Sequence, residues 1–458
     1  WTDEYGVEHY PNSNDIDNVL EDIIAQYPIN RLDWDRPYDW NYDGPVPPNL
    51  TEVLKDLRLN RLLDGCVTGW PINCERLYYG VLVDYPAGVG ADLGLGERPG
   101  HVAAGYWVGG DPSVGTHEIG HNLGRQHTLC RGDEGNPGYY PYSNGHISQF
   151  DSGDHAFYGI SITKNRIFGP STGDLMGYCR PMWVSDYTYN FLKTAIEMRY
   201  GETNNLIQRD IALVTGGEAI LINGQVLLDV GAGEIDTILQ IDSPADVSAP
   251  EPGPYTIQFL DETNNVIAEH DFDVEHVADA VEPTGIFALL LPWPTGVKEI
   301  RLLEGATILE TRFVSPNSPV VQIINPSSGA IWTGETGTII WTASDSDGDD
   351  LEYTIQYSPD AGATWSTLAI GSTVTSYEVD LNNLPGSAQA QVRVFATDGS
   401  NTGQATSGIF STPRHAPVAN IVSPTGNSFC VEEQVVTLSG KANDAEDGTI
   451  QDSSLEWS

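Results

Sequence analysis

Hydrophobic and polar positions follow two different patterns along the chain, and the change falls near residue 201. In the first part, apolar residues recur at helical spacing in residues 15–27, 49–63 and 185–199, and strand-like apolar runs occupy residues 77–85 and 101–108. From residue 204 onward, short alternating segments are separated by Gly, Pro and Asn without any helical pattern. This second pattern is typical of β-sandwich modules. We therefore predict a multidomain protein with an α/β (α+β) domain followed by tandem all-β sandwich domains.

A repeat of domain length lies near the C-terminal end. Pro319, Ile323 and Pro326 recur 98 positions later as Pro417, Ile421 and Pro424. Self-similarity at this period indicates tandem modules, which resemble bacterial fibronectin-III-like or Ig-like repeats. We therefore expect domains at residues 1–201, 202–315 and 316–415, with the truncated start of a further repeat at 416–458. Because an incomplete sandwich cannot close its core, we expect the natural protein to continue beyond Ser458.

Each repeat carries an acidic turn, at residues 344–349 and 443–448. Paired carboxylates make Ca²⁺ a candidate ligand of these turns. Ordinary Asp-Gly hairpin turns have the same composition. The spacing favours the second interpretation because it lacks the distal bidentate Glu of an EF-hand loop.

The net charge of the chain limits the kinds of molecule that it can bind. The chain has 64 acidic and 21 basic residues, a formal net charge of −43. This excludes nucleic acid as a partner and disfavours anionic membranes, because both require basic surface. No apolar run has the length of a membrane span. We expect a soluble extracellular protein kept dispersed by self-repulsion; adaptation to salt and numerous calcium sites are the alternatives.

Five cysteines indicate an oxidising compartment. Cys66 and Cys74 bracket a loop rich in Gly and Pro, and we predict that they form a local disulfide. The other three cysteines are Cys130, Cys179 and Cys430. We expect the partner of Cys430 to lie beyond the C-terminal end of this chain.

One segment, His117 to His127, has the residue types and spacing of a zinc hydrolase centre. His117 and His121 are four residues apart, so their imidazoles lie on one face of a helix and can share a metal. Glu118 follows the first ligand, where a carboxylate can take a proton from zinc-bound water. Gly124 can end the helix in a left-handed conformation and return His127 as the third ligand. Three histidines leave one zinc position open, which is typical of a catalytic site.

This pattern resembles that of the metzincin metallopeptidases, whose zinc motif is followed by a methionine turn beneath the metal. Met176, 49 residues after His127, lies in the turn-like sequence Gly-Asp-Leu-Met-Gly-Tyr-Cys. The resemblance implies that Met176 forms an apolar floor below the three imidazoles. Two interpretations of Tyr178 stay open: it helps to stabilise the oxyanion, or it packs as a wall residue. Thr128, which follows the third histidine, matches none of the common metzincin branches. The sequence Trp-x-Ser-Asp-Tyr-Thr-Tyr at residues 183–189 is similar to that of large secreted bacterial metzincins.

The resemblance carries further expectations about the cleft. The ligand loop and the methionine turn must converge, so we predict a Cys130–Cys179 disulfide between them. Residues 101–108 would be the sheet edge to which an extended peptide adds as a strand. The usual first strand of the fold would precede Trp1. Residues 131–170 would carry the specificity pocket. His146 and His155 lie there, and we interpret them as exposed loop residues, with a second metal site as the alternative.

Together these observations predict a secreted zinc endopeptidase with one catalytic Zn²⁺ and a protein or glycoprotein substrate. His117, His121 and His127 would bind the metal, and Glu118 would act as base. Every catalytic residue would lie between His117 and Tyr178. The β-modules would therefore act as binding modules or as spacers that present the enzyme to a matrix or cell surface. The alternatives are a catalytically weak adhesin or glycan-binding protein on a metzincin scaffold, and a non-proteolytic zinc hydrolase.

Overall fold

The computed structural model describes residues 9–29, 32, 41–42, 48–64, 76–83, 93–107, 113–129, 140–142, 144–162, 165–200, 218–242, 250–423, 439–444, 446 and 448–450. The chain forms two compact units. The first comprises Trp1–Asp33, Tyr42–Asn317 and Gly399–Thr402, and the second comprises Trp34–Asn41, Ser318–Asp398 and Gly403–Ser458. The segments 1–201 and 202–315, which the sequence predicts as separate domains, both fall in the first unit, apart from residues 34–41.

The protein consists mainly of β-strands, with four α-helices among the described residues. The three helices predicted from periodicity are confirmed as α1 (Ser13–Gln26), α2 (Leu50–Leu63) and α4 (Asp186–Tyr200), and α3 (Ser113–Asn122) contains the histidine motif. Polar caps define where they begin. The Asn49 side chain accepts a hydrogen bond from the Thr51 N–H (2.9 Å) at the start of α2, and Ser185 Oγ accepts one from the Thr188 N–H (3.1 Å) at the start of α4. Among the described residues, no helix combines the length and apolar character needed to cross a membrane.

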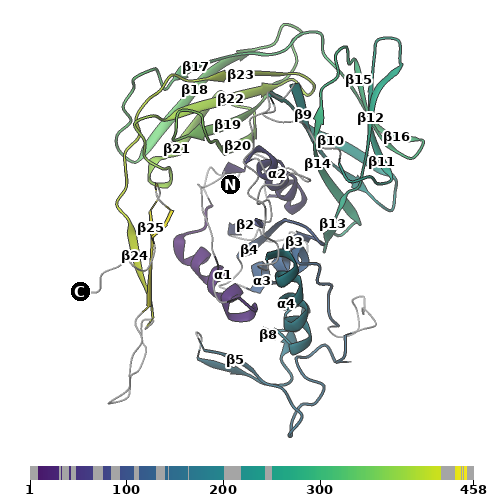
Figure 1. Ribbon diagram of the computed structural model, residues 1–458, viewed down its shortest axis with the longest axis vertical. Helices are drawn as coiled ribbons and strands as arrows, with labels where there is room; N and C mark the ends of the chain where they lie inside the picture. Colours follow the sequence, from purple (N-terminus) through teal and green to yellow (C-terminus); the bar gives the residue numbers. More distant parts are fainter. Residues whose placement is uncertain are drawn as a thin grey trace. The chain divides into compact units, whose positions relative to one another are not determined.

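A seven-stranded sheet runs through the first unit in the order β10-β9-β14-β13-β3-β4-β2 (Figure 1). Its strands are β2 (Tyr78–Val83), β3 (Gly94–Glu97), β4 (Val102–Trp107), β9 (Glu218–Leu227), β10 (Ala232–Asp242), β13 (Glu275–Ala278) and β14 (Thr284–Pro292). Only β2 and β4 pair in parallel. The strands predicted in the runs 77–85 and 101–108 are thus confirmed as β2 and β4 over the described residues. The expectation that 101–108 is the sheet edge is wrong, because β4 is paired on both sides, with β2 and β3.

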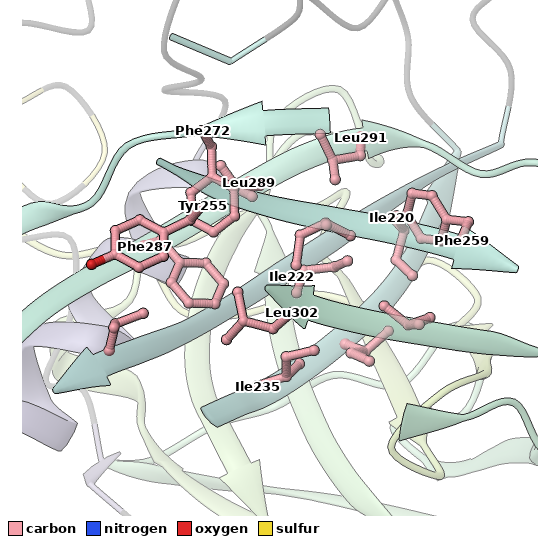
Figure 2. Packing of buried hydrophobic residues seen from close by; sticks show 14 of the residues in the cluster. Ile220, Ile222, Ile235, Tyr255, Phe259, Phe272, Phe287, Leu289, Leu291 and Leu302 are labelled. Atoms are coloured by element: carbon pink, nitrogen blue, oxygen red, sulfur yellow. The ribbon is translucent and has the colours of Figure 1, made fainter. Parts of the chain in front are cut away.

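A second sheet of the first unit covers one end of this sheet and forms a sandwich with it. Its order is β12-β11-β15-β16, and its strands are β11 (Tyr255–Leu260), β12 (Val266–Phe272), β15 (Glu299–Glu304) and β16 (Thr307–Phe313). Apolar side chains from both sheets meet in one buried core that includes Ile222, Phe259 and Phe287 (Figure 2). Short strands complete the unit: β5 (Gly159–Ser161), β6 (Arg166–Phe168), β7 (Gly173–Asp174) and β8 (Met182–Trp183). The two-residue strand β1 (Asn41–Tyr42) straddles the boundary between the units.

The second unit is all-β apart from one 3-10 turn, η1 (Leu381–Asn383), among its described residues. One sheet has the order β17-β18-β21 and another contains β20, β19, β22 and β23 in that order. These strands are β17 (Val320–Asn325), β18 (Thr336–Ser344), β19 (Glu352–Ser358), β20 (Ser366–Ser372), β21 (Ser376–Asp380), β22 (Gln391–Thr397) and β23 (Thr402–Thr406). Their inward side chains, among them Trp341 and Tyr357, share one core.

The repeat seen in the sequence has a structural counterpart. A further sheet, β24-β25-β26, contains β24 (Val418–Ser423), β25 (Ser439–Asp444) and β26 (Gly448–Ile450). β24 pairs with β25 as β17 pairs with β18, and the register shifts at equivalent places, between Ile323 and Asn325 and between Ile421 and Ser423. Both repeats therefore begin with the same bulged antiparallel pair.

The first acidic turn is held by its own backbone. Asp345 Oδ1 accepts hydrogen bonds from the N–H groups of Asp347 (2.7 Å) and Gly348 (3.1 Å), and Gly348 has a φ of 84°. This arrangement is an Asx turn with glycine in the left-handed position. The carboxylates of Asp345, Asp347 and Asp349 lie close enough together to hold a cation, but two of these residues are exposed. Ca²⁺ at this turn stays a prediction.

Candidate metal centre

The helix that carries the histidine motif is buried almost throughout. In α3 only Ile119 is partly exposed. Thr116 joins the helix to α1, because its hydroxyl donates to Asp22 (2.6 Å) and its carbonyl accepts from the Tyr27 hydroxyl (2.7 Å). Asn122 joins it to the sheet by donating to the carbonyl oxygens of Glu97 and Val102. Contacts on two sides therefore fix the orientation of α3.

The helix ends in a Schellman motif that redirects the chain. Gly124 has a φ of 88°, the left-handed conformation that the sequence predicts. Its N–H donates to the His121 carbonyl (2.7 Å), and the Arg125 N–H donates to the Gly120 carbonyl (2.9 Å). The turn brings His127 back beside the helix, so that its Nε2 lies 3.0 Å from that of His121 and 3.2 Å from that of His117.

The three imidazoles present the same ring atom to a common point. The Nε2 atoms of His117 and His121 are 3.1 Å apart. Each of these two rings donates from Nδ1 to a backbone carbonyl, His117 to Leu175 (2.8 Å) and His121 to Arg125 (2.7 Å). With the proton on Nδ1, Nε2 carries a lone pair in the neutral ring. In the neutral rings, three lone pairs therefore face one point, where a cation can bind them.

Met176 packs against the helix that carries His117 and His121. It is fully buried, and its sulfur packs so closely on the helix that a Cβ at Gly120 would come within 2.5 Å of Sδ. Its carbonyl accepts a hydrogen bond from the Thr128 N–H (2.8 Å). The turn before it supplies the Leu175 carbonyl that orients His117. The methionine turn thus contacts both the first histidine and the loop that follows the third.

Asp174 is the hydrogen-bond acceptor that holds this turn in place. This fully buried carboxylate accepts from the N–H of Met176 (2.9 Å), the N–H of Ser185 (3.1 Å) and the hydroxyl of Thr188 (3.0 Å). It therefore ties the methionine turn to the start of α4. This explains the Ser and the Thr of the sequence at residues 183–189. No motif in the sequence marks Asp174, although buried aspartates in turns commonly bind backbone N–H groups.

We expect Asp174→Ala to destabilise the first unit by roughly 3 kcal/mol or more, because three buried donors lose a charged acceptor. Urea unfolding followed by tryptophan fluorescence measures the change. Asp154→Ala removes an exposed carboxylate and serves as the control. Equal unfolding midpoints for the two variants would contradict this role.

Glu118 and Tyr178 flank the histidines. Glu118 is 3% exposed, and it lies so close to β3 that a Cβ at Gly94 would come within 2.5 Å of its Oε1. A larger residue at position 94 would therefore displace this carboxylate. The Tyr178 hydroxyl lies 3.1 Å from His127 Nε2, and its ring stacks on that of His117 with centroids 5.5 Å apart. Tyr178 is thus within reach of a group bound at the histidines, while 45% of its surface stays exposed.

A fourth residue joins the group from a distant part of the chain. Asp279 follows β13, and its carboxylate oxygens lie 2.8 Å from His127 Nε2, 3.4 Å from His121 Nε2 and 3.5 Å from His117 Nε2. From the sequence, every residue of this site is expected between His117 and Tyr178, so Asp279 is an addition to the predicted site. No sequence motif marks Asp279. Its backbone is unusual, with a φ of 66°, but this conformation cannot be read from the sequence.

The carboxylate and the imidazoles perturb one another strongly. Burial disfavours charge on His117, but Asp279 and Glu118 outweigh burial and raise its pKa to about 9. His121 behaves differently, because burial lowers its pKa to about 4 despite the same carboxylate. Burial also opposes the charge of Asp279, yet hydrogen bonds from the three histidines hold its pKa well below the usual range. Asp279 is therefore ionised and able to act as a ligand.

Other predicted site residues lie elsewhere or outside the described residues. Among the described residues, His146 and His155 belong to no cluster that could hold a metal. His146 lies 3.9 Å from Asp151, and the ring of His155 contacts that of Phe150. Cys179 is disulfide-bonded. Cys66, Cys74 and Cys130 lie outside the described residues, so the pairs Cys130–Cys179 and Cys66–Cys74 stay predictions.

Comparison with protein-family models gives no match to this chain, and comparison with curated proteins gives none either. The resemblance to metzincins therefore depends on the motif residues alone.

Proposed function

We propose that the protein is a zinc-dependent endopeptidase. One observation carries the proposal: three buried or half-buried imidazoles direct Nε2 toward a single point, while backbone carbonyls fix Nδ1 of two of them. Ligation by one ring nitrogen while the other donates to a carbonyl is the usual arrangement of a metal-binding histidine.

The donor set fits zinc. Zn–N bonds of about 2.0–2.1 Å in tetrahedral geometry place ligand nitrogens about 3.3 Å apart, and the Nε2 atoms here are 3.0 to 3.2 Å apart. His117, His121 and His127 would hold the ion. When bound, Zn²⁺ supplies a Lewis acid that activates water and polarises a carbonyl.

The chain's own residues would perform the proton transfers. Glu118, buried next to β3, would accept the proton of the attacking water and return it to the leaving amine. The Tyr178 hydroxyl, 3.1 Å from His127 Nε2, would donate a hydrogen bond to the oxygen on which negative charge develops. Met176 would limit movement of the imidazoles by filling the space below them.

Metal analysis combined with peptide digestion tests the proposal. We expect one zinc per chain and cleavage of unstructured peptides that 1,10-phenanthroline abolishes and added Zn²⁺ restores. A peptide library used as substrate would also reveal the residues preferred around the cleaved bond. Stoichiometric zinc without cleavage, both in the wild type and after Asp279→Gly, would instead favour the alternative, an adhesin or glycan-binding protein on a catalytically weak scaffold. The position of Asp279 on the histidines is the observation that favours this alternative.

A further inference from the structure

Residues 275–279 make two separate contacts within the first unit: β13 pairs with β3, and Asp279 lies against the three histidines. β13 pairs antiparallel with β3, Val277 opposite Glu97 and Ala278 opposite Gly96. β4 takes the other side of β3, so β13 fills its remaining edge, while Glu118 of α3 packs against the face of β3 at Gly94 and Gly96. Such an edge is where an extended peptide adds to a sheet.

Directly after this strand, the chain places a carboxylate on the three histidines. Asp279 Oδ2 lies 3.4 and 3.5 Å from the Nε2 atoms of His121 and His117, and Asp279 Oδ1 lies 2.8 Å from that of His127. A tetrahedral zinc with one oxygen and three nitrogen ligands has ligand separations of about 3.3–3.4 Å. The carboxylate therefore stands where a fourth ligand would bind. Its backbone has a φ of 66°, an uncommon conformation for a residue other than glycine.

Charged and backbone contacts hold the segment on both sides. Arg58 of α2 forms ion pairs with Glu97 of β3 and with Glu275 of β13, the latter at 3.4 Å. The Arg98 N–H donates to the His276 carbonyl (2.9 Å). On its far side β13 pairs with β14, with Glu275 opposite Ile286. Pairing with β14 thus connects the segment to the sandwich. Pairing with β3, the Arg58 ion pairs and the Arg98 hydrogen bond hold it against β3.

Given the zinc peptidase proposed above, on which this inference rests, we propose that residues 275–279 form an intramolecular latch: Asp279 is the fourth ligand of the metal and β13 occupies the strand position of a peptide substrate. With the latch closed, neither the attacking water nor the substrate has a place. Activity requires Asp279 to leave and β13 to separate from β3, while β14 retains the segment.

Binding of a small metal ligand tests the latch without relying on catalysis. Full-length protein is loaded with Co²⁺ and titrated with acetohydroxamate, which must displace Asp279 to bind. Asp279→Gly removes the carboxylate and tolerates the positive φ, and Asp279→Asn preserves the size of the side chain. Glu282→Ala removes an exposed carboxylate three residues away and is the matched control.

We expect Asp279→Gly to bind acetohydroxamate at least about ten-fold more tightly than wild type, because a latch closed nine-tenths of the time reduces apparent affinity by that factor. Its visible Co²⁺ spectrum should also change before any ligand is added, since water replaces a carboxylate. Hydrogen exchange in residues 272–284 should accelerate when acetohydroxamate saturates the wild type. Glu282→Ala should match the wild type in all three measurements.

The outcomes separate this inference from the proposed peptidase. Equal acetohydroxamate affinity and equal spectra in wild type and in both Asp279 variants would overturn the latch, even if all of them cleave peptides. Tighter binding by Asp279→Gly with no peptide cleavage by any form would support the latch and refute the peptidase. Failure of Co²⁺ to bind any form would overturn both.

Discussion

Glu118→Gln is expected to reduce peptide turnover by about a hundred- to ten-thousand-fold while the protein keeps one zinc per chain. The substitution preserves the size of the side chain and some of its hydrogen bonding, but an amide cannot accept the proton of the attacking water. Glu118 is buried beside Gly94, where the side chain of a larger residue would collide with it. The expected effect is therefore on kcat rather than on KM.

Turnover should be measured on the same unstructured peptide in the wild-type and the Asp279→Gly backgrounds, so that the latch does not limit the rate. Glu197→Gln, on the exposed face of α4, is the control for loss of a glutamate. Activity near that of the parent protein in Glu118→Gln would mean that another group is the base. Loss of zinc in this variant would show that Glu118 supports the site rather than the reaction.

His121→Ala should weaken zinc binding roughly a thousand-fold or more. Substitution of a residue that only hydrogen-bonds to a metal ligand typically costs about 10- to 100-fold, and loss of a ligand itself should cost far more. His121 is fully buried, and its Nε2 lies within 3.1 Å of both other imidazole Nε2 atoms. Its loss leaves two histidines and removes the ring that the Arg125 carbonyl orients. Peptide cleavage should disappear with the metal.

Competition with a chromophoric chelator measures the zinc affinity, and circular dichroism verifies that the variant is folded. His155→Ala removes an exposed histidine outside the cluster and should bind zinc like the wild type. Stoichiometric, tightly bound zinc in His121→Ala would refute the ligand assignment.

The helices of the first unit and its strands β2 and β4 could be predicted from the sequence because periodicity and capping are local signals. The helix predicted at residues 49–63 is α2, Leu50–Leu63, and the capping Asn49 explains where it starts. The histidine spacing and Gly124 similarly define the end of α3, since a Schellman motif needs a residue that adopts a positive φ. Within such segments, periodicity and capping point to the same structure.

Features that depend on pairing between distant segments could not be predicted. Residues 101–108 are a strand, but their place inside the sheet depends on β3, whose sequence Gly-Leu-Gly-Glu has weak strand propensity. Asp279 is likewise invisible to motif reasoning, because it is 162 residues from His117 and reaches the histidines only through the register of β13 on β3. Register between strands is a tertiary property that a single sequence rarely specifies.

The two glycines of β3 make the resistance of the protein to proteolysis and aggregation depend on whether the latch is closed. Gly94 and Gly96 make room for Glu118, but each glycine in a strand costs roughly 0.5–1 kcal/mol relative to alanine. β3 is now held by partners on both sides. Once β13 leaves, a weak four-residue strand becomes an exposed edge that other proteases can attack and that can pair with other chains. An opened molecule would therefore have a shorter lifetime than a closed one, which limits its activity to a brief period after release.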